Sequence, residues 1–205
     1  MNSFLICLEI FILFIVPVLP SFFNRVPKKY RFHLFAAIIL IAATIVLSEH
    51  WSLNKLGIDL NNISNGLPLY FIFTVAGLIY IFALAKILKY KPTPNWWNNN
   101  HFLFGFILMS IGQEFLYRGF LMPDLKLVFS SVIAVVLINA LLFTFIHIIY
   151  PNRKANLITA FIGGLCFAGI YYYYPNLILI SISHMILNFA VVYFGMFTFK
   201  DDELV

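Results

Sequence analysis

The chain has 205 residues, of which 62% are hydrophobic and only 10% are charged, and its formal net charge is +5. A water-soluble domain carries about 25% charged residues, so this composition excludes a soluble globular protein and predicts a polytopic membrane protein. The positive charge does not call for a nucleic-acid partner, because most basic residues lie in short segments between apolar runs, where they orient membrane helices.

Seven apolar segments are long enough to cross a bilayer, which takes roughly 20 residues. They lie near residues 3–23, 32–49, 67–88, 102–121, 128–150, 155–174 and 176–199. The last two form one long uncharged stretch that the sequence YYYYPN divides, because Pro175 and Asn176 favour a turn and tyrosines favour the membrane interface. The predicted fold is therefore an all-α, polytopic bundle of about seven transmembrane helices.

Basic residues follow the first, third, fifth and seventh predicted spans. They are Arg25, Lys28, Lys29 and Arg31, then Lys86, Lys89 and Lys91, then Arg153 and Lys154, and finally Lys200. All four groups share one side of the membrane if the N-terminus lies outside and the C-terminus is cytoplasmic. We therefore predict a multi-pass integral protein of the cell membrane in that orientation, in contact with membrane lipid.

The stretch GQEFLYRGF, residues 112–120, places Glu114 and Arg118 inside the fourth predicted span. An ionisable side chain at the centre of a bilayer costs about 2.5–3.5 kcal/mol on insertion scales, and such residues usually serve function. Their i, i+4 spacing puts both side chains on one face of a helix, where they can pair. The pair predicts either an internal ionic contact or part of a functional site.

Two further helical pairs occur later in the chain. FTFIH places Phe143 and His147 at i, i+4 on the fifth span, and HMILN places His184 and Asn188 in the same way on the seventh. With Glu114 these polar groups are expected to line one intramembrane cavity formed by the late helices. His147 lies near the end of its span, so convergence requires either a longer fifth span or that the segment GFLMPDLK, residues 119–126, folds back into the protein.

Such a set of side chains favours hydrolysis of an amide bond. A carboxylate and an imidazole can hold and deprotonate a water molecule, while a second imidazole and a carboxamide can donate hydrogen bonds to a developing oxyanion. Two histidines and a glutamate could instead bind zinc. The helical HExxH spacing is absent and each histidine lies on a separate helix, so zinc is possible but not favoured and no cofactor is predicted.

The ordered motifs resemble those of the CAAX-protease and bacteriocin-processing family of intramembrane endopeptidases, whose bacterial members are often labelled Abi proteins. These motifs are an acidic pair followed by xxxR, then FxxxH, then HxxxN, and the glycine-rich IGGLCFAGIYYYY between the last two is also similar to the family. The resemblance implies three regions. They are N-terminal transmembrane helices and connectors over residues 1–100, a catalytic helical core over 101–199, and a short cytoplasmic tail over 200–205.

The resemblance also implies roles for individual residues. The first acidic position, here Gln113, would activate the attacking water with His147, and Glu114 would pair with Arg118. His184 and Asn188 would form the oxyanion hole, with Phe143 in a supporting position. Gln113 departs from the family pattern, because a carboxamide can hold a water molecule but cannot take its proton near neutral pH.

The function predicted from the sequence is that of an intramembrane CAAX-type endopeptidase that hydrolyses membrane-associated peptides. The alternative is a catalytically impaired member that acts as a membrane scaffold or as a bacteriocin self-immunity protein. A small transporter would also place polar groups at mid-depth, but the two halves of the chain show no repeat, which counts against it. A peptide or protein substrate is expected, and no nucleic acid.

Overall fold

The computed structural model describes residues 2–23, 25–60, 63–94, 100–149 and 153–196. Within these residues the chain is helical and contains no strand, which confirms the all-α class. The helices are α1 (Ser3–Ile10), the π-helix η1 (Phe11–Ile15), α2 (Val18–Phe22), α3 (Lys28–Ser48), α4 (Ile63–Ile87), α5 (Asn100–Glu114), the π-helix η3 (Phe115–Phe120), α6 (Leu121–Val128), α7 (Val132–Ile146), the 3₁₀ turn η4 (His147–Ile149), α8 (Arg153–Tyr173) and α9 (Leu177–Tyr193).

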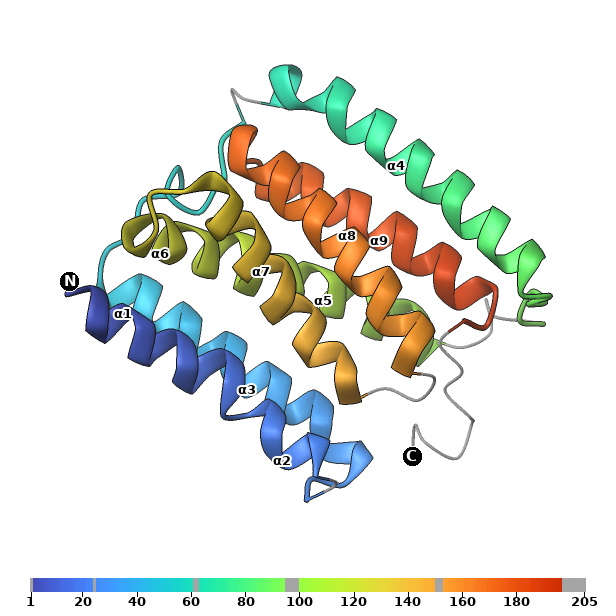
Figure 1. Cartoon of the computed structure of the whole chain (residues 1–205), viewed down its shortest axis with the longest axis horizontal. Coiled ribbons are helices and arrows are strands. Elements are labelled where there is room, and N and C mark those ends of the chain that lie inside the picture. Colours follow the sequence, from blue (N-terminus) through green and yellow to red (C-terminus); the bar gives the residue numbers. More distant parts are fainter. Residues whose placement is uncertain (1, 24, 61–62, 95–99, 150–152, 197–205) are drawn as a thin grey trace.

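Most of the long helices lie side by side along one direction (Figure 1). Helices α1 and α3 border one side of the bundle, α4 borders the opposite side, and α7, α8 and α9 lie between them. Helix α8 packs on α7, and α9 packs on both α4 and α5. This arrangement brings α5, α7, α8 and α9, which carry the candidate site, into one interior.

Each of the seven predicted spans coincides with a helix or a run of consecutive helices. The predicted division after YYYY is confirmed, because α8 ends at Tyr173 and α9 begins at Leu177. Asn176 caps α9: its side chain accepts a hydrogen bond from the Leu179 amide at 3.0 Å and donates one to the Asp59 carbonyl at 3.1 Å. Asn176 thus starts α9 and ties its first turn to the loop between α3 and α4.

Two stretches of the described chain are both long and apolar enough to cross a membrane, Ser3–Phe22 and Ile63–Ile87. Four further apolar helices are shorter: His33–Ser48, Val132–Ile146, Leu157–Tyr173 and Leu177–Tyr193. The count of seven spans therefore stays a prediction.

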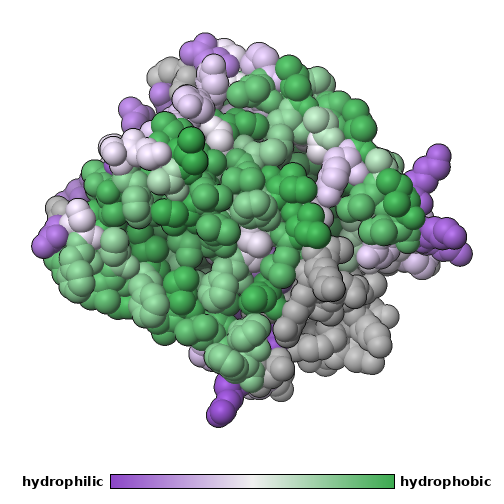
Figure 2. Space-filling view, viewed as in Figure 1, coloured by the Kyte–Doolittle hydropathy of each residue, from purple (hydrophilic) through white to green (hydrophobic). Residues whose placement is uncertain are grey.

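The surface has the apolar character that a lipid-facing bundle requires. Hydrophobic residues cover most of the face in Figure 2, and the most hydrophilic residues lie around its edge. On α4 the exposed side chains include Leu67, Phe71, Ile72, Ile79 and Phe82. Such a continuous apolar face is rare on a soluble monomer.

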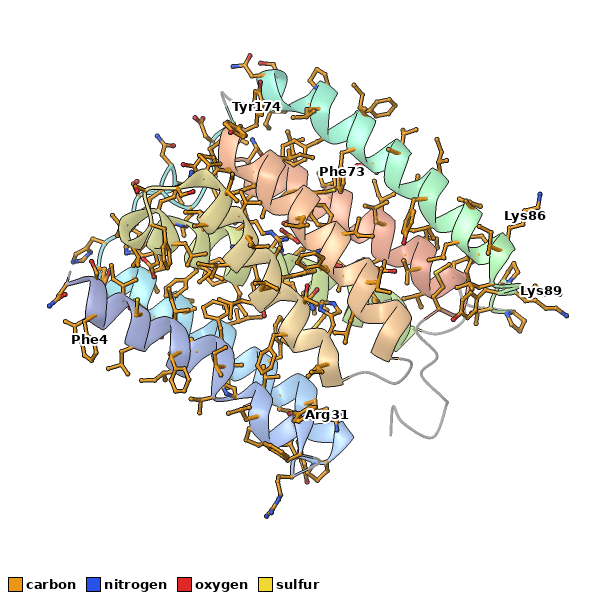
Figure 3. The ribbon with its side chains drawn as sticks, viewed as in Figure 1. Phe4, Arg31, Phe73, Lys86, Lys89 and Tyr174 are labelled. Atoms are coloured by element: carbon orange, nitrogen blue, oxygen red, sulfur yellow. The ribbon has the colours of Figure 1, made fainter. Side chains whose placement is uncertain are left out.

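Figure 3 places the labelled basic residues Arg31, Lys86 and Lys89 at the same end of the helices, away from Phe4 and Tyr174. Two of the four predicted basic groups therefore share one end of the bundle, as the proposed orientation requires. Lys200 and the predicted tail, residues 200–205, lie outside the described residues.

Residues 119–126, one of the two segments whose path could bring the site together, are helical and mostly buried. They span the end of η3 and most of α6, and Phe120, Leu121, Met122, Asp124 and Leu125 are all buried. Helix α6 contacts α1 and α7. The fold therefore encloses the residues that follow Arg118.

Candidate active site

The site begins where α5 changes into the π-helix η3, immediately after Glu114. The Leu121 amide donates to the Leu116 carbonyl, five residues earlier, instead of to Tyr117 as an α-helix would require. A π-turn of this kind inserts one extra residue into a helix and is frequent at functional sites. All residues from Leu116 to Met122 are buried, so the widened turn is surrounded by protein.

The predicted pair of Glu114 and Arg118 is formed and completely buried. Arg118 Nη1 donates to Glu114 Oε1 at 3.3 Å, and Nε lies 3.3 Å from Oε2, close enough for an ionic contact but without hydrogen-bond alignment. Arg118 Nη2 donates to the Gly164 carbonyl on α8 at 3.3 Å. The guanidinium also lies 4.5 Å from the ring centroid of Phe143, where a cation–π contact stabilises it.

Gly164 lets α8 approach α7 closely enough for this contact. A Cβ at this position would lie 3.1 Å from Phe143 Cδ1 and 3.3 Å from Ala140 Cα, which is backbone and cannot move aside. The glycine-rich stretch therefore has a local purpose: it brings a backbone carbonyl to Arg118.

His184 on α9 contacts the same carboxylate. Its Nδ1 lies 2.5 Å from Glu114 Oε1, and its ring packs against Phe167 and Phe143 with centroids 5.2 Å and 5.9 Å away. Glu114 is held by Arg118 and is therefore ionised, and an ionised carboxylate only accepts hydrogen bonds. Nδ1 of His184 consequently carries a proton.

His147 follows the last residue of α7 and begins the turn η4. Its Nδ1 lies 2.8 Å from the Phe143 carbonyl, which can only accept, so this nitrogen is also protonated. In the neutral ring Nε2 is then the unprotonated nitrogen. His147 packs on Phe143 with ring centroids 4.8 Å apart and is within electrostatic range of His184 and Arg118.

Asn188, one helical turn after His184, donates from Nδ2 to Ser110 Oγ at 3.1 Å. Ser110 is fully buried and donates in turn to the Phe106 carbonyl at 2.8 Å. Because the hydroxyl proton is used within α5, Ser110 can only accept from Asn188, which fixes the orientation of the carboxamide.

Gln113 is buried beside Glu114, with 4% of its surface exposed. Among the described residues its side chain has no hydrogen-bond partner.

The structure thus joins Glu114, Arg118, His184 and Phe143 by direct contact. His147 connects to them through Phe143, and Asn188 through Ser110 and helix α5. Ser110, Gly164 and Phe167 are site residues that were not predicted from the sequence, although Ser110 stands four residues before Glu114 and so shares its helix face. Among the described residues no group of three or more His, Cys, Asp or Glu side chains is placed to hold a metal ion.

Comparison with known proteins identifies the segment that contains this site. Residues 95–190 match the family described as type II CAAX prenyl endopeptidase Rce1-like, and this range includes every site residue from Ser110 to Asn188. No curated protein and no solved structure gave a match. The family consists of membrane-embedded peptidases. Residues 95–190 of this chain are therefore similar to the Rce1-like family of type II CAAX prenyl endopeptidases, in agreement with the motifs that they contain.

Proposed function

We propose that the protein is an intramembrane CAAX-type endopeptidase that cleaves a peptide bond of a membrane-associated substrate with an activated water molecule. The observation that carries the proposal is the contact of Glu114 with both Arg118 and His184, within the segment that matches the peptidase family. The site would work in the plasma membrane of a bacterium, in a multi-pass protein with a cytoplasmic C-terminus. Its catalytic core would extend over residues 101–199.

In this proposal the two histidines have opposite roles, because their surroundings differ. His184 Nδ1 donates to the Glu114 carboxylate, and in the imidazolium form its Nε2 also carries a proton that can be donated to an oxyanion. His147 Nδ1 donates to the Phe143 carbonyl, so in the neutral ring Nε2 is unprotonated and can accept the proton of a water molecule.

The proposed reaction proceeds in two steps. Water attacks the substrate carbonyl carbon while His147 Nε2 takes its proton and Gln113 holds it in place, and the developing oxyanion accepts hydrogen bonds from His184 Nε2 and Asn188 Nδ2. The C–N bond then breaks, and the proton on His147 passes to the leaving amine. Glu114 and Arg118 do not exchange protons in this scheme, because each is held by the other.

The second candidate is a member of the family that has lost efficient catalysis and acts as a membrane scaffold or self-immunity protein. Gln113 favours this candidate, because loss of a general base typically costs ~10²–10⁴-fold in rate. The same substitution leaves His147 as the proton acceptor in the peptidase proposal.

Cleavage assays with purified protein separate the two candidates. Prenylated and unprenylated peptides are incubated with the protein in lipid vesicles, and the products are identified by mass spectrometry. A peptidase is expected to give one defined cleavage that His147→Ala and His184→Ala abolish, while Lys126→Ala, an exposed change on α6, has no effect. Absence of cleavage of any peptide by the folded parent, or cleavage that survives both histidine changes, would reject the peptidase proposal.

A further inference from the structure

Asn139 is a buried polar residue that the site described above does not use. It lies on α7 and has no exposed surface. Its Nδ2 donates to the Tyr117 carbonyl in the π-helix η3 at 2.5 Å, and its Oδ1 is buried without a hydrogen-bond partner among the described residues. A carbonyl can only accept, so the orientation of the amide group is fixed by chemistry.

The carbonyl that Asn139 holds is the one that the π-turn has displaced from α-helical pairing. In an α-helix Tyr117 would accept from the Leu121 amide, but that amide donates to Leu116. Asn139 supplies a donor to Tyr117 from a different helix. If this donor were lost, Leu121 could return to Tyr117 and the turn would tighten by one residue, which is about 100° of rotation.

The position of this hydrogen bond links it to the site. Tyr117 contributes its carbonyl to the peptide unit directly before Arg118, and Arg118 holds Glu114, which holds His184. A rotation at this peptide would move the guanidinium away from Glu114 and the Gly164 carbonyl. The His184 imidazole would then lose the position of the carboxylate oxygen that Nδ1 contacts.

The unpaired Oδ1 of Asn139 argues against the view that this residue only stabilises the fold. An unpaired buried acceptor costs about 1–3 kcal/mol, which offsets much of what the Tyr117 hydrogen bond contributes. A leucine of similar size would remove this cost together with the donor. The amide is therefore poorly explained by packing, and well explained by its effect on the backbone of η3.

We infer that Asn139 is a positioning residue that locks the π-turn and thereby holds Arg118, Glu114 and His184 in their arrangement. The inference deepens the proposed function and rests on it for the meaning of the site. The test observes the hydrogen bond of His184 by NMR and does not depend on peptide cleavage. Failure of this inference can therefore be distinguished from failure of the proposed function.

The experiment uses the full chain labelled with ¹⁵N-histidine, in detergent micelles, and records the long-range nitrogen–proton correlations of each imidazole. His184→Gln and His147→Gln identify the two site histidines. The parent is expected to show a strongly hydrogen-bonded Nδ1 proton for His184. Asn139→Leu is expected to abolish this signature and to shift both His184 nitrogens.

Tyr70→Phe serves as the matched control. It also removes a hydrogen bond from a buried side chain near the site to a backbone carbonyl, Tyr70 Oη to Tyr174 at 2.8 Å, but that carbonyl follows α8 and is not part of η3. The control is expected to leave the His184 signals unchanged. Asn139→Leu signals that overlay those of the parent would overturn the inference, whatever happens to the melting temperature.

Asn139→Asp keeps the test decisive if the leucine variant does not fold. The introduced carboxyl can donate to Tyr117 only while it is protonated, and it repels the carbonyl when it is ionised. The His184 signature is therefore expected to match the parent at low pH and to be lost at a pH where the parent keeps it. Identical pH behaviour of parent and variant would overturn the inference.

Discussion

His184 Nδ1 lies 2.5 Å from Glu114 Oε1, so one buried carboxylate joins α9 to the junction of α5 and η3. The same oxygen accepts from Arg118 Nη1 at 3.3 Å. Glu114 therefore accepts from two side chains at once, and its carboxylate holds Arg118 and His184 in place. In the proposed reaction the proton acceptor is His147, because the carboxamide of Gln113 cannot take a proton.

Arg118→Ala should destabilise the protein strongly. The change leaves Glu114 buried without its cationic partner, which costs about 3–5 kcal/mol, and also removes the contact with Gly164. Thermal or denaturant unfolding in detergent measures the loss. The control is Lys86→Ala at the exposed end of α4, which should stay within about 0.5 kcal/mol of the parent. An Arg118→Ala protein as stable as the parent would show that the pair contributes nothing.

Asn188→Ala should lower kcat by ~10²–10³-fold if its amide stabilises the oxyanion. Ser110→Ala should have a smaller effect of ~5-fold, because it removes one neutral hydrogen bond of about 1 kcal/mol that orients the amide. Both changes should leave KM nearly unchanged, since the oxyanion forms only in the transition state. Steady-state kinetics on a cleaved peptide test this ranking. A larger loss for Ser110→Ala than for Asn188→Ala would contradict the order of roles.

Asp124 should make stability dependent on pH. It lies on α6, outside the predicted spans, with both carboxylate oxygens buried and without hydrogen-bond partners among the described residues. The pKa of Asp124 is raised to about 7, mainly because the side chain is buried; the negative charges of Glu9 and Glu49 add to the rise, and the positive charge of Lys55 opposes it. Its ordinary pKa is near 3.8.

The sign follows from the raised pKa. Between pH 4 and pH 7 the folded protein holds a proton on Asp124 that the unfolded chain has released, so this contribution to stability falls as the pH rises through that window. Asn at this position cannot ionise. Asp124→Asn should therefore melt increasingly above the parent as the pH is raised from 5 to 8, as followed by thermal unfolding of both proteins in the same detergent. Parallel curves would mean that Asp124 does not titrate in this range.

Much of the fold could be predicted because hydrophobic segments and turn residues act locally. Pro175 and Asn176 mark the division between α8 and α9 in the sequence, and the structure adds that Asn176 caps α9. The pairing of Glu114 with Arg118 follows from helical spacing alone, and the structure confirms it.

The remainder depends on contacts between residues that are distant in sequence. The sequence FLYRGF does not indicate the π-turn in η3. The hydrogen bond that stabilises this turn comes from the side chain of Asn139, 22 positions after Tyr117. The contact of Glu114 with His184 spans 70 positions. Sequence motifs indicated that both residues belong to one site, but not that they touch each other. Helix α6 could likewise not be predicted as a separate helix, because its eight residues follow η3 without a break.

Gln113→Glu tests whether this chain has lost its general base. Gln113 is buried next to Glu114 and can hold a water molecule but cannot take its proton. Since Glu114 is held by Arg118 and His184, it cannot replace the missing carboxylate. Restoring the carboxylate at residue 113 should raise the rate of peptide cleavage by ~10²-fold, towards the range of general-base catalysis. The change adds a second buried carboxylate beside Glu114, so the melting temperature should fall slightly. Gln113→Met, which has similar size and no hydrogen-bonding amide, is the matched control and should cleave no faster than the parent.

The cleavage rates of the parent, Gln113→Glu and Gln113→Met on one peptide test this prediction. A parent that cleaves as fast as Gln113→Glu would show that His147 alone suffices as the base. If Gln113→Glu does not cleave while its His184 spectrum matches that of the parent, the scaffold candidate is favoured over the peptidase.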